Sequence, residues 1–337
     1  MKLLPLLLLF VVAVPTHEPT TLAQTAKNPA QEQAPQKEAT KPVKSEFEFI
    51  RLRKDGRKLM AMETNVVRYT NSIKYPGATV DLIGAIHMAD PDYYDKLNQL
   101  FTKYDVLLYE AVKDEGVDVS KRQAKGKPNR GGRSQDGVDT ETMVGLSAIG
   151  ILQMGMKDAL GLEYQMQGID YAKKNFVHAD MTTREFQRSM QRRGESFGSM
   201  MLKEMGKAAT QDMGNPLAQQ IDLMFSLMSS DREIRVRRIV ASQLAKASTA
   251  EAFADENGES TIITERNKKA LGVLEEQLDK GVKKIGIFYG AAHMPDMEKR
   301  LREEFYFKRG DTKWLQAWKL RRDKAKKKEQ AEPKAEK

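Results

Sequence analysis

A five-residue unit occurs twice in this chain, and it constrains the fold more than any other feature of the sequence. The first copy, Gly-Ala-Ile-His-Met, spans residues 84–88, and the second, Gly-Ala-Ala-His-Met, spans residues 290–294. Each copy follows an apolar run that predicts a buried strand and precedes a predicted helix. We expect each Gly to let the backbone turn sharply at positive φ, so that His87 and His293 are delivered to the C-terminal edge of a sheet. Open α/β sheets bind their ligands at that edge.

The pattern around the two copies predicts an α/β fold with a central mixed sheet, in which β-α-β units carry the two Gly-X-X-His motifs at strand ends. A strand at 79–83, a helix at 91–103 and a strand at 105–109 form one such unit, which implies parallel strands. The second copy lies in a similar setting. The other elements that we expect are strands at 47–53, 58–69, 176–178 and 284–289, helices at 264–280 and 295–304, a loop at 114–139, a large, mainly helical and Met-rich insertion at 141–251, and a closing stretch at 314–318.

The candidate active centre consists of His87, His293 and Glu110. Glu110 ends the strand at 105–109, so its carboxylate should emerge at the same edge as the two imidazoles. Two imidazoles and a carboxylate form a common set of ligands for a divalent metal ion. Alternatively, Glu110 is a general base while the histidines bind metal or polarise the substrate. His178 lies outside the repeated unit, which favours a structural role.

Several other kinds of chemistry are disfavoured by the sequence. The chain has no Cys, which excludes disulfides, thiolate metal sites and Cys nucleophiles. It has neither a zincin His-Glu-X-X-His helix nor a Gly-rich phosphate loop after its first strand. The net charge of +9 is partly local, because residues 319–337 hold nine Lys or Arg against four Asp or Glu. We therefore expect no nucleic-acid partner and at most weak contact with a membrane or envelope surface.

The two ends of the chain read as segments outside the folded domain. Lys2 and the apolar run at 3–14 are typical of a signal peptide, with a plausible cleavage site at 21–23. We expect a signal peptide at 1–23, a disordered linker at 24–45 and a basic disordered tail at 319–337. The protein would then be periplasmic or secreted. The alternative is an uncleaved N-terminal segment that anchors it.

The ordered set of motifs resembles the TraB/PrgY/GumN family, which includes the Tiki proteins. The resemblance rests on Gly-Ala-Ile-His at 84–87, Glu110 after an apolar strand, Glu-Arg-Asn at 265–267, and Gly-Ala-Ala-His at 290–293. It implies a metal-dependent hydrolase fold over residues 46–318, and Tiki members act as metalloproteases. A further carboxylate commonly follows a middle strand in that family, and Asp180 falls nearest to that place. Arg266 could pair with a site carboxylate or stabilise a developing oxyanion.

Three functions compete at this stage. The first is a metal-dependent hydrolase that cleaves peptide or amide bonds in a peptide or small-molecule substrate, with Glu110 and Arg266 as catalytic residues and His87, His293 and Glu110 as ligands of a divalent metal ion. The second is a non-enzymatic protein that holds a peptide, haem or metal in the same cleft. The third is an inactive scaffold. Measurements of bound metal and of turnover separate the three.

Overall fold

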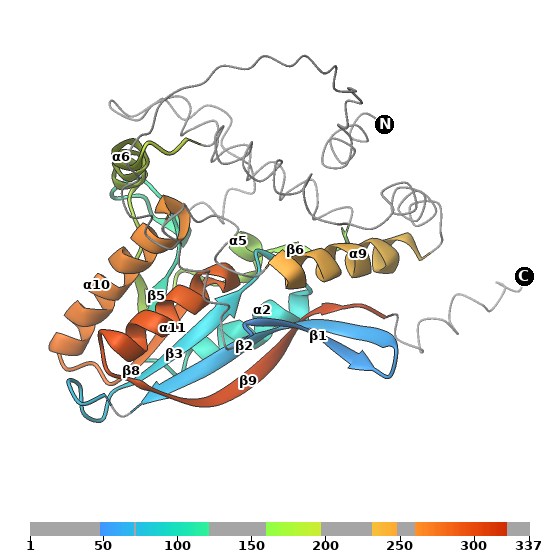
Figure 1. Ribbon diagram of the computed structural model, residues 1–337, viewed down its shortest axis with the longest axis horizontal. Helices are drawn as coiled ribbons and strands as arrows, with labels where there is room; N and C mark the ends of the chain where they lie inside the picture. Colours follow the sequence, from blue (N-terminus) through green and yellow to red (C-terminus); the bar gives the residue numbers. More distant parts are fainter. Residues whose placement is uncertain (1–47, 71, 121–159, 197–230, 248–259, 322–337) are drawn as a thin grey trace, which may run out of the picture.

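A seven-stranded mixed sheet forms the centre of the computed structural model (Figure 1). Its parallel half has the order β3 (Thr79–Ala85), β8 (Lys284–Gly290), β5 (Val106–Tyr109) and β7 (Phe176–His178). The two strands that carry the repeated unit are therefore direct neighbours, and the strand that leads to Glu110 lies beside the second of them. The predicted α/β fold with a mixed central sheet is confirmed.

The structure describes residues 48–70, 72–120, 160–196, 231–247 and 260–321. The expected signal peptide, the expected linker and nearly all of the expected basic tail lie outside these residues, as do most of the loop at 114–139 and much of the Met-rich insertion. The parts of that insertion that are described are α5 (Gln165–Gly168), α6 (Thr183–Arg193), α9 (Arg232–Ala247), β7 and a short strand, β6 (Glu163–Tyr164).

The antiparallel half of the sheet is organised by the long strand β2 (Lys58–Thr70). β1 (Ile50–Asp55) pairs with its first part and β3 with its last part. β9 (Lys308–Lys319) pairs along most of β2, with residues that also have a partner in β1 or β3, so it occupies the opposite edge. The sequence predicted only a closing stretch at 314–318, because the first half of β9 is exposed and strongly charged and lacks an apolar pattern.

Helices cover both faces of the sheet. α2 (Pro91–Phe101) packs on one face, while α10 (Arg266–Asp279) and α11 (Met294–Glu303) pack on the other (Figure 1). Alternate residues of β3 belong to different cores: Leu82 packs with α10 and α11, and Ile83 packs with α2. A parallel strand buried on both faces reads as a continuous apolar run, which explains why the sequence located these strands well.

The predicted helices begin and end within a few residues of the observed ones. The helix expected at 264–280 is preceded by a π-helical turn, η2 (Thr261–Glu265), so that α10 itself begins at Arg266. π-helical turns are often found at functional sites. β4 (Met88–Ala89), which directly follows the first histidine, pairs with β6.

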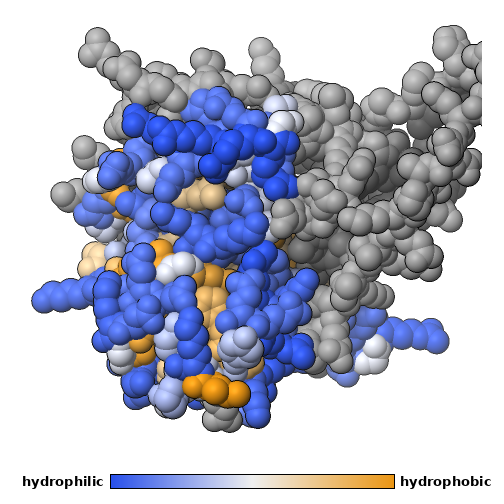
Figure 2. Space-filling view, turned by 60° about the vertical axis from the view of Figure 1, so that its left-hand side comes forward, coloured by the Kyte–Doolittle hydropathy of each residue, from blue (hydrophilic) through white to orange (hydrophobic). Residues whose placement is uncertain are grey.

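The outer surface on the side of α6 and α10 is largely hydrophilic, with hydrophobic residues visible only between polar ones (Figure 2). Ile73 is the most exposed of the large hydrophobic residues in the described part of the chain, at 84%. Within the same part, no helix combines the length and the apolar character that crossing a bilayer requires.

Candidate functional site

The structure brings the three predicted residues to one place at the C-terminal edge of the parallel strands. His87 lies two residues beyond β3, Glu110 directly follows β5, and His293 ends a short 3-10 helix, η3 (Ala291–His293), that follows β8. A Cβ atom added to Gly290 would stand 3.3 Å from Glu110 Oε2, 3.6 Å from His293 Cδ2 and 3.8 Å from His87 Nε2. Each of these atoms is within 4 Å of that point and hence within 8 Å of the other two.

The two motif glycines do not have the role that the sequence suggested. Neither Gly84 nor Gly290 has positive φ, and the value at Gly290 is −51°. β3 continues through Gly84, and β8 ends at Gly290 where η3 begins, in neither case at positive φ, so the expectation of a turn at positive φ was wrong. Gly290 is required for a different reason, because any side chain there would press against the Glu110 carboxylate.

The Glu110 carboxylate is held by hydrogen bonds at both oxygens. Oε1 accepts a hydrogen bond from Arg266 Nη2 at 2.6 Å, and Oε2 accepts one from the Gly290 backbone N–H at 2.6 Å. His293 Nε2 lies 3.6 Å from Oε1. Burial alone would raise the pKa of Glu110, but the charge of Arg266, with smaller contributions from the two histidines, holds that pKa well below its usual range. Glu110 is therefore a carboxylate at any pH near neutral.

Arg266 is buried between two carboxylates. Besides Glu110, it binds Asp180 with two hydrogen bonds, from Nε at 3.0 Å and from Nη2 at 2.7 Å. The Asp180 side chain is fully buried, and Asp180 follows β7, the fourth strand of the parallel half. The guanidinium thus pairs with site carboxylates, which is the first of the two roles considered for it. Planar pairing with two donors fixes orientation as well as charge.

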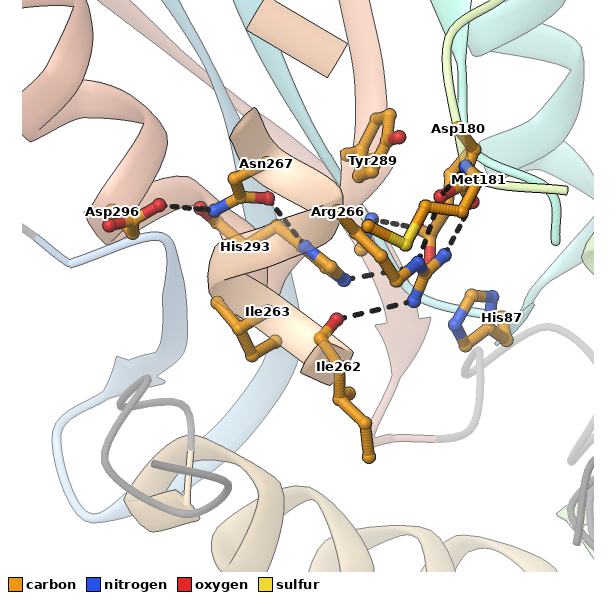
Figure 3. Close-up of polar contacts among 12 residues, drawn as sticks. His87, Asp180, Met181, Ile262, Ile263, Arg266, Asn267, Tyr289, His293 and Asp296 are labelled. Carbon is orange, nitrogen blue, oxygen red and sulfur yellow. Dashed lines mark hydrogen bonds and ion pairs between the residues drawn. The ribbon is translucent and has the colours of Figure 1, made fainter. Parts of the chain in front are cut away.

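His293 is fixed by a single amide side chain (Figure 3). Asn267 Nδ2 donates to the His293 backbone carbonyl at 3.1 Å and to Asp296 at 2.8 Å, so its oxygen faces His293 Nδ1 at 2.7 Å. Nδ1 must therefore carry the proton, which leaves the lone pair of Nε2 directed toward Glu110. Burial lowers the pKa of His293 to about 4, despite the nearby Glu110 carboxylate, so the imidazole is neutral at pH 7.

His87 has a corresponding partner in Gln165, which is buried. The Gln165 side-chain oxygen faces His87 Nδ1 at 3.2 Å, and the Gln165 backbone N–H donates to the His87 carbonyl at 2.8 Å. The amide nitrogen of Gln165 donates to the Tyr171 hydroxyl at 2.9 Å. His87 Nε2 is the nitrogen that faces Gly290 and the carboxylate. Both histidines of the repeated unit thus turn the same ring nitrogen toward Glu110.

The structure separates His178 from this centre. Its Nε2 donates to the Ala111 backbone carbonyl at 2.7 Å, and its ring stands edge-on to Tyr109. These contacts agree with the structural role favoured from the sequence. Sequence reasoning missed the roles of Gln165 and Asn267. Asn267 carried a signal, since it belongs to the Glu-Arg-Asn motif, whereas Gln165 lies in the Met-rich insertion and carried none.

Residues 194–198 read Gly-Glu-Ser-Phe-Gly, which matches the spacing of the nucleophile elbow of serine hydrolases. An elbow requires a strand before the first Gly. Gly194 instead ends helix α6 in the left-handed conformation, at φ 64°. Gly194 is therefore a helix cap, and the match does not support a serine nucleophile.

The chemistry of this site follows from its donor atoms. Two imidazole nitrogens and a carboxylate oxygen are groups that bind divalent transition metals. As they stand in the described part of the chain, no three His, Asp or Glu residues are close enough to hold one ion together. The 3.6 Å between His293 Nε2 and Glu110 Oε1 is slightly longer than the roughly 3.3 Å that separates two ligands each about 2 Å from a tetrahedral ion.

A comparison with models of protein families gives a match that covers most of the chain. The model of the TraB/PrgY/gumN family matches residues 71–305, which is more than half of the chain. The matched span contains both copies of the repeated unit, Glu110, Asp180 and Arg266. No curated protein matches the sequence.

Proposed function

This chain belongs to the TraB/PrgY/gumN family, and on that premise we propose that it is a metal-dependent hydrolase that cleaves peptide or amide bonds. The observation that carries the proposal is the matched orientation of the two histidines. His87 and His293 both present Nε2 toward Glu110, while a side-chain amide oxygen is hydrogen-bonded to Nδ1 of each ring. Metal-binding histidines usually have a partner of this kind on their second nitrogen.

The three side chains fit a divalent metal ion in their donor chemistry. His87 and His293 would bind through Nε2, and Glu110 would bind through a carboxylate oxygen. An effective general base has a pKa near the working pH, whereas the pKa of Glu110 is held far below it. Glu110 is thus better suited to be the third ligand than the base. When bound, a divalent metal ion polarises a carbonyl oxygen and lowers the pKa of water.

The surrounding residues keep these groups in place. Arg266 holds Glu110 deprotonated and fixes one of its oxygens, and the Gly290 N–H fixes the other. Asp180 balances the charge of Arg266, so the buried cation does not depend on Glu110 alone. The same hydrogen bonds leave a free lone pair on each carboxylate oxygen of Glu110, because such an oxygen accepts more than one bond.

The proposal is tested on the purified protein by metal analysis and by hydrolysis of a peptide library with and without added Zn²⁺ or Mn²⁺. We expect bound metal and turnover, both lost in His87→Ala and His293→Ala. Glu110→Gln separates the roles of the carboxylate: loss of metal makes it a ligand, whereas retained metal with lost turnover makes it the base. A bound ligand without turnover would instead indicate the binding protein, and neither would indicate a scaffold.

We also propose that the protein is exported and cleaved after residue 23, on the grounds of Lys2 and the apolar run at 3–14. N-terminal sequencing of the protein recovered from its native envelope tests this directly. An intact Met1 on a cytoplasmic product would contradict export, and an intact Met1 in the membrane fraction would indicate an anchor.

The sequence also gives one domain at 46–318 between a linker at 24–45 and a basic tail at 319–337, although the first residues assigned to the tail belong to the fold: Lys319 ends β9 and Leu320 is fully buried. Both flanking segments lack the apolar periodicity of a packed element. Limited proteolysis should remove them and leave one resistant core, and resistance of the flanks would contradict these boundaries.

A further inference from the structure

The amide side chains of Gln165 and Asn267 contact the two histidines of the repeated unit in matching ways. We infer that Gln165 and Asn267 are positioning residues that fix the neutral tautomers of His87 and His293, with the proton on Nδ1 and the lone pair of Nε2 directed at the centre of the site. The reason for such positioning rests on the proposed function, since a metal ion binds an unprotonated Nε2. The tautomers themselves are properties of the protein without metal.

The contacts of the two amides correspond closely. Asn267 contacts His293 twice, at ring Nδ1 and at the backbone carbonyl. Gln165 contacts His87 at the same two places, with its side-chain oxygen at Nδ1 and its own backbone N–H at the carbonyl. Each amide residue therefore fixes both the position of the loop and the orientation of the ring. Such double contact is more than a packing role requires.

Two acceptors fix the orientation of the Asn267 amide, and the Gln165 amide lies in the same sense, with its oxygen toward the ring. Asn267 Nδ2 donates to Asp296 and to the His293 carbonyl, which are acceptors only. Gln165 Nε2 is 2.9 Å from the Tyr171 hydroxyl. With the oxygen facing Nδ1 in both cases, each ring must donate from Nδ1. In the neutral ring, Nε2 is then the free acceptor.

The two positioning residues come from different parts of the fold. Asn267 is the second residue of α10, inside the three-layer core, and is fully buried. Gln165 follows β6, which pairs with β4 directly after His87. The insertion thus contributes a residue to the active centre itself, although neither Gln165 nor its strand is part of the repeated unit. The pairing of β4 with β6 places Gln165 beside His87.

Histidine side-chain nitrogen NMR on the full chain, treated with a chelator, tests the inference directly. The chain has four histidines, so the imidazole signals can be assigned by single substitutions. We expect His87 and His293 of the wild type to be protonated on Nδ1. In Gln165→Met, His87 should lose that single tautomer while His293 keeps it, and Gln165→Glu, which retains the acceptor, should restore it. Asn267→Leu should have the same effect on His293 alone.

Gln187→Met is the matched control, because Gln187 is a buried glutamine of α6 whose Oε1 has no hydrogen-bond partner among the described residues. It should leave both tautomers unchanged. The inference is overturned if wild-type His87 carries its proton on Nε2, a result that needs no variant to fold. It is also overturned if folded Gln165→Met retains the Nδ1 proton on His87.

A second measurement connects the tautomers to the proposed metal. Loss of an outer-shell partner typically weakens metal binding by about 10–100-fold. Titration with Zn²⁺ should show a loss of this size in Gln165→Met, recovery in Gln165→Glu, and no change in Gln187→Met. If the tautomers are as inferred but the wild type binds no metal ion, the proposed function fails while the positioning roles stand. If Zn²⁺ binds the wild type and Gln165→Met equally, the role of Gln165 in positioning the ligand is overturned.

Discussion

The two histidines of the repeated unit occupy matching places but have different surroundings. His293 is 4% exposed and is held by Asn267 from within the core, and burial lowers its pKa to about 4. His87 is only partly buried and is held by Gln165 from the insertion. His293 and Asn267, the His293 half of the site, are thus built into the sheet and its helices. His87 and Gln165, the His87 half, depend on a segment far away in the sequence.

The two copies of the motif therefore contribute to one site in different ways. The His293 half provides a rigid reference, because the ring is hydrogen-bonded to Asn267 near the start of α10 and packs edge-on against Tyr289. The His87 half can vary with the insertion without disturbing the core. Changes to the His293 half should therefore affect stability most, and changes to the His87 half should affect ligand binding most.

The largest effect should come from Arg266→Met, which removes the cation that both Glu110 and Asp180 bind. Breaking a buried ion pair on one side typically costs about 3–5 kcal/mol of unfolding free energy, because a buried charge is left unpaired. Urea denaturation measures it. Lys269→Met is the control, since its partner Glu185 and Lys269 itself are each 41% exposed and such pairs contribute about 0–1 kcal/mol. Equal losses in the two variants would contradict the buried network.

Replacing the two histidines one at a time tests the comparison directly. His293→Ala should lower the unfolding free energy by about 2–3 kcal/mol, because it opens a cavity and leaves the Asn267 oxygen without its donor. His87→Ala should cost less than about 1 kcal/mol, because its site is partly open to water. Metal-free protein is used for both denaturation curves. A larger loss in His87→Ala would reverse the comparison.

The pH dependence of stability should come mainly from the His293 half. Its pKa falls from an ordinary value of 6.5 to about 4 in the folded protein, so the unfolded chain takes up the proton first. Stability is complete above pH 6.5, is lost progressively below it, and the loss ends near pH 4. Between pH 7 and pH 5 the loss should be about 2 kcal/mol. His293→Gln, measured beside the wild type in chelator, should remove this part of the slope.

The smallest effect should distinguish the two motif glycines. Gly290→Ala places a methyl group 3.3 Å from Glu110 Oε2, which Arg266 prevents from moving freely, so a loss of about 1 kcal/mol is expected. Gly84→Ala meets its nearest atom at 3.5 Å, an ordinary contact, and should change stability by less than about 0.5 kcal/mol. Thermal denaturation of both variants is sufficient. A greater loss in Gly84→Ala would show that the first glycine is the more constrained.

Much of the fold could be predicted because the parallel strands are buried on both faces. The strand at 176–178 was located to the residue, and the apolar runs before the two repeated units were located within a few residues. The meeting of His87, Glu110 and His293 also followed from the sequence, because parallel strands expose their C-terminal ends at one edge. The first half of β9 was not predicted, since this half is charged and its pairing with β2 is decided by tertiary contact.

The supporting residues of the site could not be predicted in the same way. Gln165 reaches His87 across 78 positions of sequence through the two-residue strand β6, which has no periodicity of its own. The role of Gly290 depends on the place of the Glu110 carboxylate, which no local pattern contains. Residue types and strand positions predicted which three side chains meet at the sheet edge, whereas the hydrogen-bond partners of these side chains required the three-dimensional structure.

The position of β8 in the sheet also bears on the order in which the protein can fold. β8 lies between β3 and β5, although it follows both of them by more than 170 residues in the chain. A growing chain that has been synthesised only as far as β7 lacks the strand with which both β3 and β5 pair. Pairing across such long separations is slow to form. The strand that completes the parallel half of the sheet is therefore also the one that leads to His293, so His87, Glu110 and His293 can come together only after almost the whole domain has been made.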